Sequence, residues 1–212
     1  MEIISGLFNF FLHIDKHVAV IIDNYGPLTY AILFFIIFLE TGFVVTPFLP
    51  GDSLLFTAGT LASTTSLNPL ILFILLALAA IIGDTVNYWT GHFVGPKVFK
   101  EKNNRFLKKE HLDKTNKFYE KHGGKTIILA RFIPIIRTFA PFVAGVGRMS
   151  YFHFISFNIV GGVLWVGMFV FGGYYFGSLP IIKNNFHLVI FVIIFLSILP
   201  AIIEYLRHRK KN

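Results

Sequence analysis

The chain has 212 residues, of which 55% are hydrophobic and only 14% are charged, and it contains no cysteine. Soluble domains have about 25% charged residues, so this composition excludes an ordinary soluble protein and predicts a single membrane domain over residues 1–212. The lack of cysteine also excludes disulfides, thiolate metal sites and cysteine nucleophiles.

The net charge of +8 comes mainly from two basic clusters. Ten of the 19 Lys and Arg residues lie between Lys97 and Lys125, and four more lie between Arg207 and Lys211. Basic clusters beside apolar segments are typical of cytoplasmic loops that contact anionic lipids. We therefore expect no nucleic-acid partner, and we place the 97–125 loop and the C-terminus in the cytoplasm.

Taken in order, the segments predict an all-α polytopic membrane protein. Polar residues at helical spacing indicate an amphipathic interfacial helix at the start of each half. Long apolar runs predict membrane spans of about 20 residues or more. The expected segments are amphipathic helices at 2–22 and 97–122, re-entrant hairpins at 28–67 and 126–148, and transmembrane spans at 69–95, 151–178 and 186–206.

The hairpin at 28–67 consists of two short apolar segments around a centre that carries Glu40 and Asp52. An Asp at the centre of a membrane helix costs about 2.5–3.5 kcal/mol on insertion scales. Prolines in the centre also remove amide donors and disfavour helix before them. Broken backbone with charge is tolerated in a bilayer only within protein or beside a watery cavity. The residues expected to break this hairpin are Pro47, Pro50 and Gly51.

The hairpin at 126–148 has the same organisation but opposite charge, with Arg131, Arg137 and Arg148 among apolar residues. Because positive-inside counting places the loop before it in the cytoplasm, this hairpin enters the membrane from the cytoplasm and the first enters from outside. The pattern predicts an inverted repeat of re-entrant hairpin plus transmembrane helix, whose hairpins meet near the midplane. The residues expected to break the second hairpin are Pro134, Pro141 and Gly145.

Three motifs in this order resemble the DedA family, which is also called the SNARE-associated or VTT-domain family. They are Glu40 followed by Pro47-x-x-Pro50-Gly51-Asp52, then Gly83-Asp84-x-x-x-Tyr88-x-x-Gly91, then Arg131-Phe132-x-Pro134-x-x-Arg137 through Pro141-x-x-Ala144-Gly145. The resemblance covers residues 25–180 and implies a bacterial plasma-membrane protein with two facing re-entrant loops. It further implies movement of lipids or ions, with members that return undecaprenyl phosphate to the cytoplasmic leaflet as the cell-wall carrier and others that are proton-dependent. By the same resemblance, Glu40, Asp52, Arg131 and Arg137 match the family's essential charged positions.

The residues themselves point to phosphate chemistry at the second hairpin. A guanidinium group binds phosphate bidentately and stays charged when buried, so Arg131 and Arg137 are the candidate headgroup ligands. The N–H groups at the start of a broken helix also favour an anion. The alternative is that both arginines only pair with Glu40 and Asp52 in a structural network.

The carboxyl groups of Glu40 and Asp52 are the candidate proton carriers. Burial and a nearby arginine act in opposite directions on the protonation of a carboxyl group. Protonating either acid frees an arginine for phosphate, which couples proton movement to lipid movement. The expected partners are therefore an anionic lipid substrate and protons, and homo-oligomerisation stays open.

Three other residues are secondary candidates. Asp84 and Tyr88 lie four residues apart on one helical face, and a structural role is favoured for Asp84. Arg148 suits an interfacial anchor. The histidines show no metal-ligand spacing, so we expect no metal and no cofactor. Gly91-x-x-x-Gly95 and Gly173-x-x-x-Gly177 match the small-residue pattern of helix packing.

We expect a transporter and not an enzyme. The leading hypothesis is a flippase for polyprenyl phosphate, with undecaprenyl phosphate as the favoured substrate. Its alternatives are a proton-dependent transporter of ions or small drugs, which uses the same acids, and a flippase or scramblase of another phospholipid. A lipid phosphatase needs a nucleophile or base beside the arginines, and neither hairpin contains a histidine. A scaffold protein has no need of four buried charges.

Overall fold

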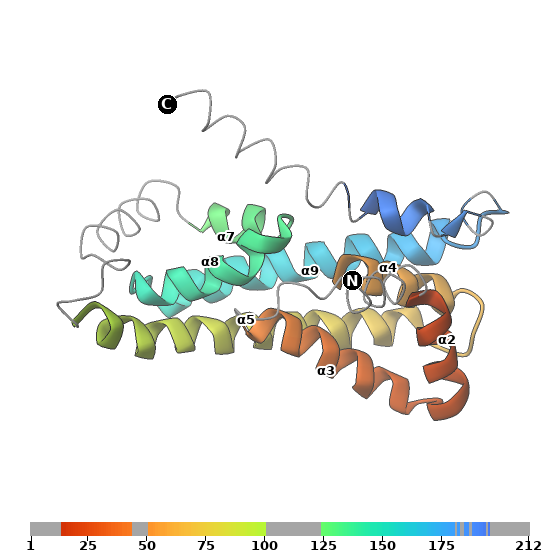
Figure 1. Cartoon of the computed structure of the whole chain (residues 1–212), viewed down its shortest axis with the longest axis horizontal. Coiled ribbons are helices and arrows are strands. Elements are labelled where there is room, and N and C mark those ends of the chain that lie inside the picture. Colours follow the sequence, from red (N-terminus) through yellow and green to blue (C-terminus); the bar gives the residue numbers. More distant parts are fainter. Residues whose placement is uncertain are drawn as a thin grey trace, which may run out of the picture. The chain divides into compact units, whose positions relative to one another are not determined.

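The structure is a computed structural model that describes residues 14–43, 51–100, 124–180, 182, 185–186, 188–193 and 195. The described residues form helices and turns, with no strand among them, as expected for an all-α protein (Figure 1). The helices are α2 (Ile14–Tyr25), α3 (Leu28–Gly42), α4 (Gly51–Ala62), α5 (Pro69–Lys100), α7 (Lys125–Ala130), α8 (Pro134–Val146) and α9 (Tyr151–Phe176).

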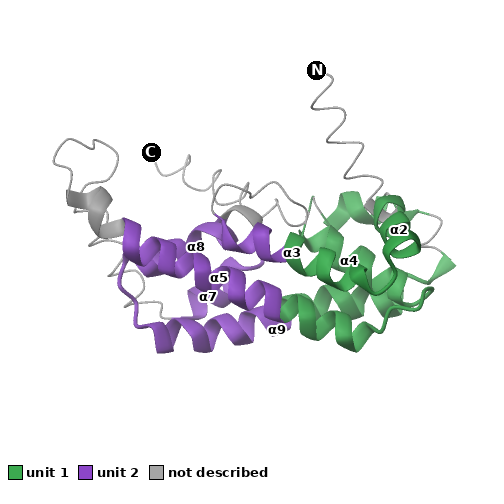
Figure 2. Ribbon diagram, turned by 90° about the horizontal axis from the view of Figure 1, so that it is seen from below, with its two compact units in different colours: residues 1–36, 48–77, 165–212 green, residues 37–47, 78–164 purple. Residues whose placement is uncertain are grey.

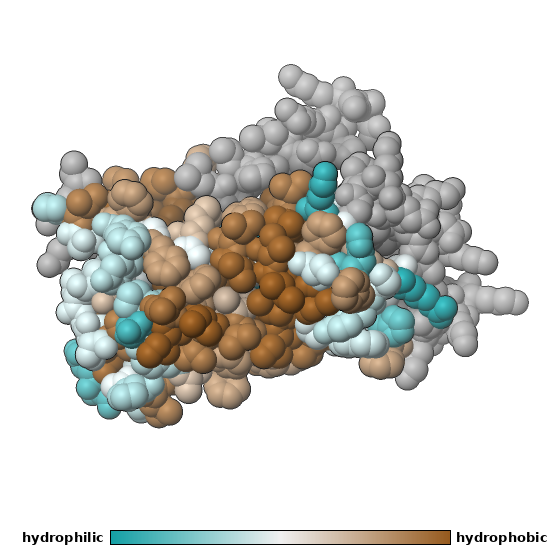
Figure 3. Space-filling model, turned by 180° about the vertical axis from the view of Figure 1, so that it is seen from behind, coloured by the Kyte–Doolittle hydropathy of each residue, from teal (hydrophilic) through white to brown (hydrophobic). Residues whose placement is uncertain are grey.

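Within the described ranges, α5 and α9 are long and apolar enough to cross a membrane, over Pro69–Val94 and Tyr151–Phe176. Large apolar side chains are exposed along both helices, for example Ile74 on α5 and Leu164 on α9. One face of the molecule shows a broad hydrophobic patch (Figure 3). Exposed apolar surface of this extent suits lipid hydrocarbon and not water. The α5 helix continues through Gly95 and Pro96 to Lys100, beyond the predicted end of its span.

Sequence chemistry explains where the helices begin and end. Gly26 has a φ of +50° and its N–H donates to the Ile22 carbonyl at 2.9 Å, which is the left-handed cap that ends a helix. At the start of α5, the Asn68 side-chain oxygen accepts from the N–H groups of Leu70 and Ile71 at 2.9 and 3.2 Å. An Asn cap followed by proline is a strong start signal.

Each predicted hairpin contains two short helices. The first includes α3 and α4, and the second includes α7 and α8. Pro134 is the first residue of α8, and the preceding Ile133 is extended, so this proline separates α7 from α8 as predicted. Pro141 does not break the helix, because α8 continues through it to Val146. One missing hydrogen bond is tolerated where neighbouring groups surround the backbone.

Several predicted features lie outside the described residues. They are Pro47 and Pro50, the part of the 2–22 helix before Ile14, the part of the 97–122 helix after Lys100, and most of the 186–206 span.

The chain forms two compact units, coloured separately in Figure 2. Unit 1 comprises residues 1–36, 48–77 and 165–212, and unit 2 comprises residues 37–47 and 78–164. The α5 and α9 helices each contribute one part to each unit.

In unit 1, α4 packs closely on α9 through glycine. A Cβ atom at Gly59 would collide with the carbonyl group of Val170, and one at Gly173 would collide with the carbonyl group of Phe56. The Thr60 hydroxyl donates to the Gly173 carbonyl at 3.2 Å. Small residues of this kind let membrane helices approach until their backbones touch.

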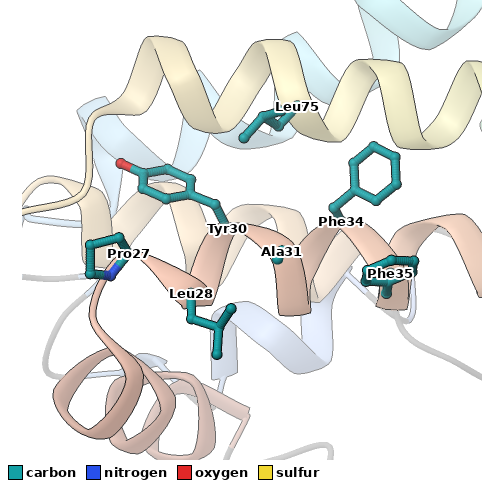
Figure 4. Close-up of a pocket in the computed structure, with 7 residues that line it drawn as sticks. All are labelled: Pro27, Leu28, Tyr30, Ala31, Phe34, Phe35 and Leu75. Atoms are coloured by element: carbon teal, nitrogen blue, oxygen red, sulfur yellow. The ribbon is translucent and has the colours of Figure 1, made fainter.

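Unit 1 also has an apolar pocket of about 520 Å³ at the start of α3 (Figure 4). The hydroxyl of Tyr30, one of its lining residues, accepts from the Asn68 N–H at 2.6 Å. This bond fastens the start of α5 to α3. The pocket is lined by Pro27, Leu28, Tyr30, Ala31, Phe34, Phe35 and Leu75.

Unit 2 repeats the glycine arrangement between α5 and α8. A Cβ atom at Gly91 would collide with the carbonyl group of Phe142, and one at Gly145 would collide with the carbonyl group of Tyr88. The spacing is the same in both units: on each helix, the glycine comes three positions after the residue whose carbonyl group faces the glycine of the other helix. Gly145 therefore serves as a packing residue in the last turn of α8.

We predict that Gly145→Ala destabilises the protein by about 1–3 kcal/mol, the usual cost of overpacking. Its methyl group has no room beside the Tyr88 carbonyl. Gly172→Ala is the matched control, because a Cβ atom there meets nothing within 4 Å. Denaturation in detergent should show a loss for Gly145→Ala only, and equal stability of the two variants would contradict the packing.

Candidate functional site

The first ion pair in unit 2 joins Glu40 to Arg137. Glu40 lies near the end of α3 and Arg137 lies in the first turn of α8, and Nη2 of Arg137 donates to Oε1 of Glu40. Both side chains are buried. A proposed proton carrier and a proposed phosphate ligand are therefore direct partners.

The second ion pair joins Arg131 to Asp84. Arg131 lies in the link between α7 and α8, and its Nη2 atom donates to Asp84 Oδ2 on α5 and to Asn158 Oδ1 on α9. The amide nitrogen of Asn158 in turn donates to the Ile81 carbonyl on α5 at 3.0 Å. Asn158 thus holds Arg131 while it also fastens α9 to α5.

Asn87 on α5 links α3 to α8 within unit 2. Its amide nitrogen donates to the carbonyl groups of Thr41 on α3 and Thr138 on α8, at 3.2 and 2.7 Å. Gly83 makes this approach feasible, because a Cβ atom there would collide with the Thr41 hydroxyl. The α3 and α5 helices thus touch at Thr41 and Gly83, directly beside Glu40 and Asp84.

These six side chains form what we call the buried polar cluster: Glu40, Asp84, Asn87, Arg131, Arg137 and Asn158. Each is at most 3% exposed. Its two carboxylates and two guanidinium groups sum to zero formal charge at neutral pH. A buried ion pair is stable only when its charges are matched and hydrogen-bonded. Chemically, a guanidinium group of such a cluster can exchange its carboxylate for another anion, and a carboxylate can take up a proton.

Asp52 belongs to unit 1, on α4. Its Oδ1 atom accepts a hydrogen bond from Nε1 of Trp165 on α9 at 2.8 Å. The α4 helix carries two further buried hydroxyls, those of Ser53 and Thr57, which have no hydrogen-bond partner among the described residues. Unit 1 therefore has buried polar groups of its own, and Trp165 is one partner of Asp52.

The secondary candidates have distinct environments. Asp84 is the partner of Arg131, a pairing that the sequence does not predict. The Tyr88 hydroxyl donates to the Met149 carbonyl, and its ring stacks on Phe154 with centroids 4.5 Å apart. Arg148 is exposed and adopts a φ of 53° directly after α8. Tyr88 thus fastens the link between α8 and α9 to α5, and Arg148 is not among the residues of the buried polar cluster.

Sequence reasoning misses Asn87, Asn158 and Trp165 as members of buried polar contacts. Asn158 is the one amide residue in the apolar α9 helix, and this is the signal that could have identified it. Asn87 follows Asp84 at helical spacing. Among the described residues, no group of three or more His, Cys, Asp or Glu could hold a metal ion.

The fold and site define an all-helical membrane protein with short paired helices and a buried, charge-balanced polar cluster. The sequence model of the VTT domain matches residues 49–175, and the chain belongs to this family, the DedA family. It is 55% identical to Protein DedA of Escherichia coli strain K12 over 99% of this chain and 97% of that protein. No solved structure matches the chain.

Two further relatives extend the comparison. A mycobacterial relative, Uncharacterized membrane protein ML0287 of Mycobacterium leprae, is 45% identical over 79% of this chain and 75% of its own length. Inner membrane protein YqjA of Escherichia coli strain K12 is 33% identical over 72% of this chain and 69% of its own length.

We predict that the Glu40–Arg137 pair is energetically coupled. Removing one partner of a buried pair costs about 3–5 kcal/mol, because the other charge is left uncompensated. Glu40→Gln and Arg137→Gln should each be costly, and the double variant should cost less than their sum. Denaturation of all four proteins measures the coupling, and additive costs would contradict it.

Proposed function

We propose that this protein is a flippase for an anionic polyprenyl lipid, most specifically undecaprenyl phosphate, which it returns to the cytoplasmic leaflet for cell-wall synthesis. It acts in the bacterial plasma membrane, with the 97–125 loop and the C-terminus in the cytoplasm. The helix pairs α3–α4 and α7–α8 are re-entrant hairpins of an inverted repeat. Transport is coupled to protons.

The observation that carries this proposal is the burial of two arginines, each on a carboxylate. Arg131 and Arg137 are 1% and 3% exposed. Charged side chains inside a membrane protein are energetically costly, and they typically mark substrate pathways. Guanidinium is also the cation best suited to phosphate, which it binds through two parallel hydrogen bonds. An apolar protein that keeps two such groups therefore has the chemistry for a lipid phosphate.

Exchange of partners gives the transport step. In the resting arrangement Glu40 occupies Arg137. When Glu40 takes a proton it becomes neutral, and Arg137 can then exchange its bond to Glu40 for a bond to the phosphate headgroup. Release of that proton on the other side restores the ion pair and expels the phosphate. The start of α8 adds backbone N–H groups near Arg137, which also favour an anion.

Two features support the repeat and a path for the lipid tail. Both units pack a short hairpin helix on a long helix through the same pair of glycine contacts, as expected for an internal repeat. The exposed apolar side chains of α5 and α9 offer a surface along which a polyprenyl chain stays in hydrocarbon while its headgroup moves.

We predict that Arg137→Lys lowers the flipping rate of undecaprenyl phosphate by about tenfold or more. Lysine keeps the charge and a bond to Glu40 but loses the second bond to phosphate, and a bond to a charged group contributes about 1.5–3 kcal/mol. The assay reconstitutes the protein in liposomes and follows labelled undecaprenyl phosphate between leaflets. Arg148→Lys is the control, because Arg148 is exposed, and it should flip lipid at the native rate.

A second prediction concerns pH. Glu40→Gln should abolish or shift the pH dependence of flipping, because glutamine cannot exchange a proton. An unchanged pH profile would remove Glu40 from the mechanism. If the protein does not accelerate flipping at all but carries a proton-linked ion flux, the function is the alternative, a proton-dependent ion or drug transporter.

A further inference from the structure

The α5 helix carries two buried oxygen atoms that no donor among the described residues reaches, Asp84 Oδ1 and Asn87 Oδ1. Asp84 is 2% exposed and Asn87 is 0% exposed. The two residues are three positions apart on one helix, where side chains are neighbours with Cβ atoms about 5–6 Å apart. The other Asp84 oxygen, Oδ2, is occupied by Arg131.

The Asn87 amide has only one consistent orientation. Both hydrogens of its nitrogen are used, on the carbonyl groups of Thr41 and Thr138 at 3.2 and 2.7 Å. Turning the amide over would place its oxygen against two carbonyl oxygens. Oδ1 of Asn87 is therefore an acceptor and has no hydrogen to offer Asp84.

Two buried acceptors three residues apart on one helix need a positively charged or donating occupant. An ionised carboxylate and an amide oxygen both only accept hydrogen bonds, and leaving them bare in low dielectric is unfavourable. We propose that Asp84 Oδ1 and Asn87 Oδ1 form a binding site for one monovalent cation, and that this cation is a proton bound to Asp84 and hydrogen-bonded to Asn87. A proton needs only these two oxygens, whereas hard metal cations collect about six or more.

The charged groups around Asp84 determine the effect of that proton. Arg131 from the α7–α8 link is its ion-pair partner, and the Glu40–Arg137 pair from α3 and α8 completes the charged groups of the buried polar cluster. Neutralising Asp84 changes the formal charge of this cluster from zero to +1, because it removes the negative charge that Arg131 faces. A phosphate then restores the balance. This step rests on the proposed function, and it makes proton and phosphate binding mutually favourable.

Infrared difference spectroscopy tests the site without any transport. Purified full-length protein is titrated with acid, and the carbonyl stretching band of a protonated carboxyl group is followed, with its deuterium shift. We expect a band that Asp84→Asn abolishes and that Asn87→Leu shifts through loss of the hydrogen bond. Glu40→Gln is the matched control and should keep it. Only variants that fold are compared, and if Asp84→Asn does not fold, the band is assigned by its shift in Asn87→Leu, which keeps both ion pairs.

A sodium series at fixed pH separates the two cations. A carboxylate band at Asp84 that shifts with sodium chloride but not with choline chloride assigns sodium to the site in place of the proton. If the native protein shows neither a band that Asp84→Asn removes nor a sodium response, a water molecule fills the site and the proposal is wrong.

Farnesyl phosphate then tests the coupling separately. Coupling between two sites usually changes affinity by about 5- to 150-fold, so this soluble polyprenyl phosphate should raise the midpoint of the Asp84 titration by about one to two pH units. A band that is present but indifferent to farnesyl phosphate keeps the proton site and overturns its link to phosphate. Normal flipping by the native protein with no Asp84 band would leave the flippase in place and overturn the site.

Discussion

Two guanidinium groups in an apolar domain set the conditions that the other residues must meet. A buried charge without a partner destabilises a protein by several kcal/mol, so each arginine requires an acid within hydrogen-bonding distance. The α3 helix supplies Glu40 to Arg137, and α5 supplies Asp84 to Arg131. These pairs form only if α3 packs beside α8 and α5 packs beside the α7–α8 link. Gly83 also lets α5 approach α3, because the Thr41 hydroxyl takes the space of its missing Cβ atom.

Charge balance also connects the two proposals. With both acids ionised the buried polar cluster is neutral, so an entering anion creates an excess of negative charge in low dielectric. Protonation of Glu40 or Asp84 removes that excess and releases an arginine in the same event. The two ion pairs differ in their neighbours, since Arg131 also donates a hydrogen bond to Asn158 on α9. Phosphate binding can thus be accompanied by two separate protonations, one at Glu40 and one at Asp84.

Charge inside apolar stretches is conspicuous, and so the sequence predicts Glu40, Asp52, Arg131 and Arg137 as candidates and the long apolar runs as spans. The pairing of these charges could not be predicted, because it depends on which helices cross. The sequence favours a structural role for Asp84, whereas in the structure α5 places its carboxylate in an ion pair with Arg131. Trp165 carries no sign in the sequence that its ring nitrogen binds Asp52. The break expected at Pro141 was wrong, since the effect of a proline depends on what surrounds the freed carbonyl.

The glycine contacts have a consequence for how the chain is made. The α4 helix of the first half packs on α9 of the second half, and α8 of the second half packs on α5 of the first. During synthesis α4 therefore leaves the ribosome long before its partner exists, and Asp52 is made before Trp165 can donate to it. Neither compact unit can be completed by one half of the chain. The order of translation thus leaves the polar groups of α4 without the α9 contacts until the last third of the protein has been made.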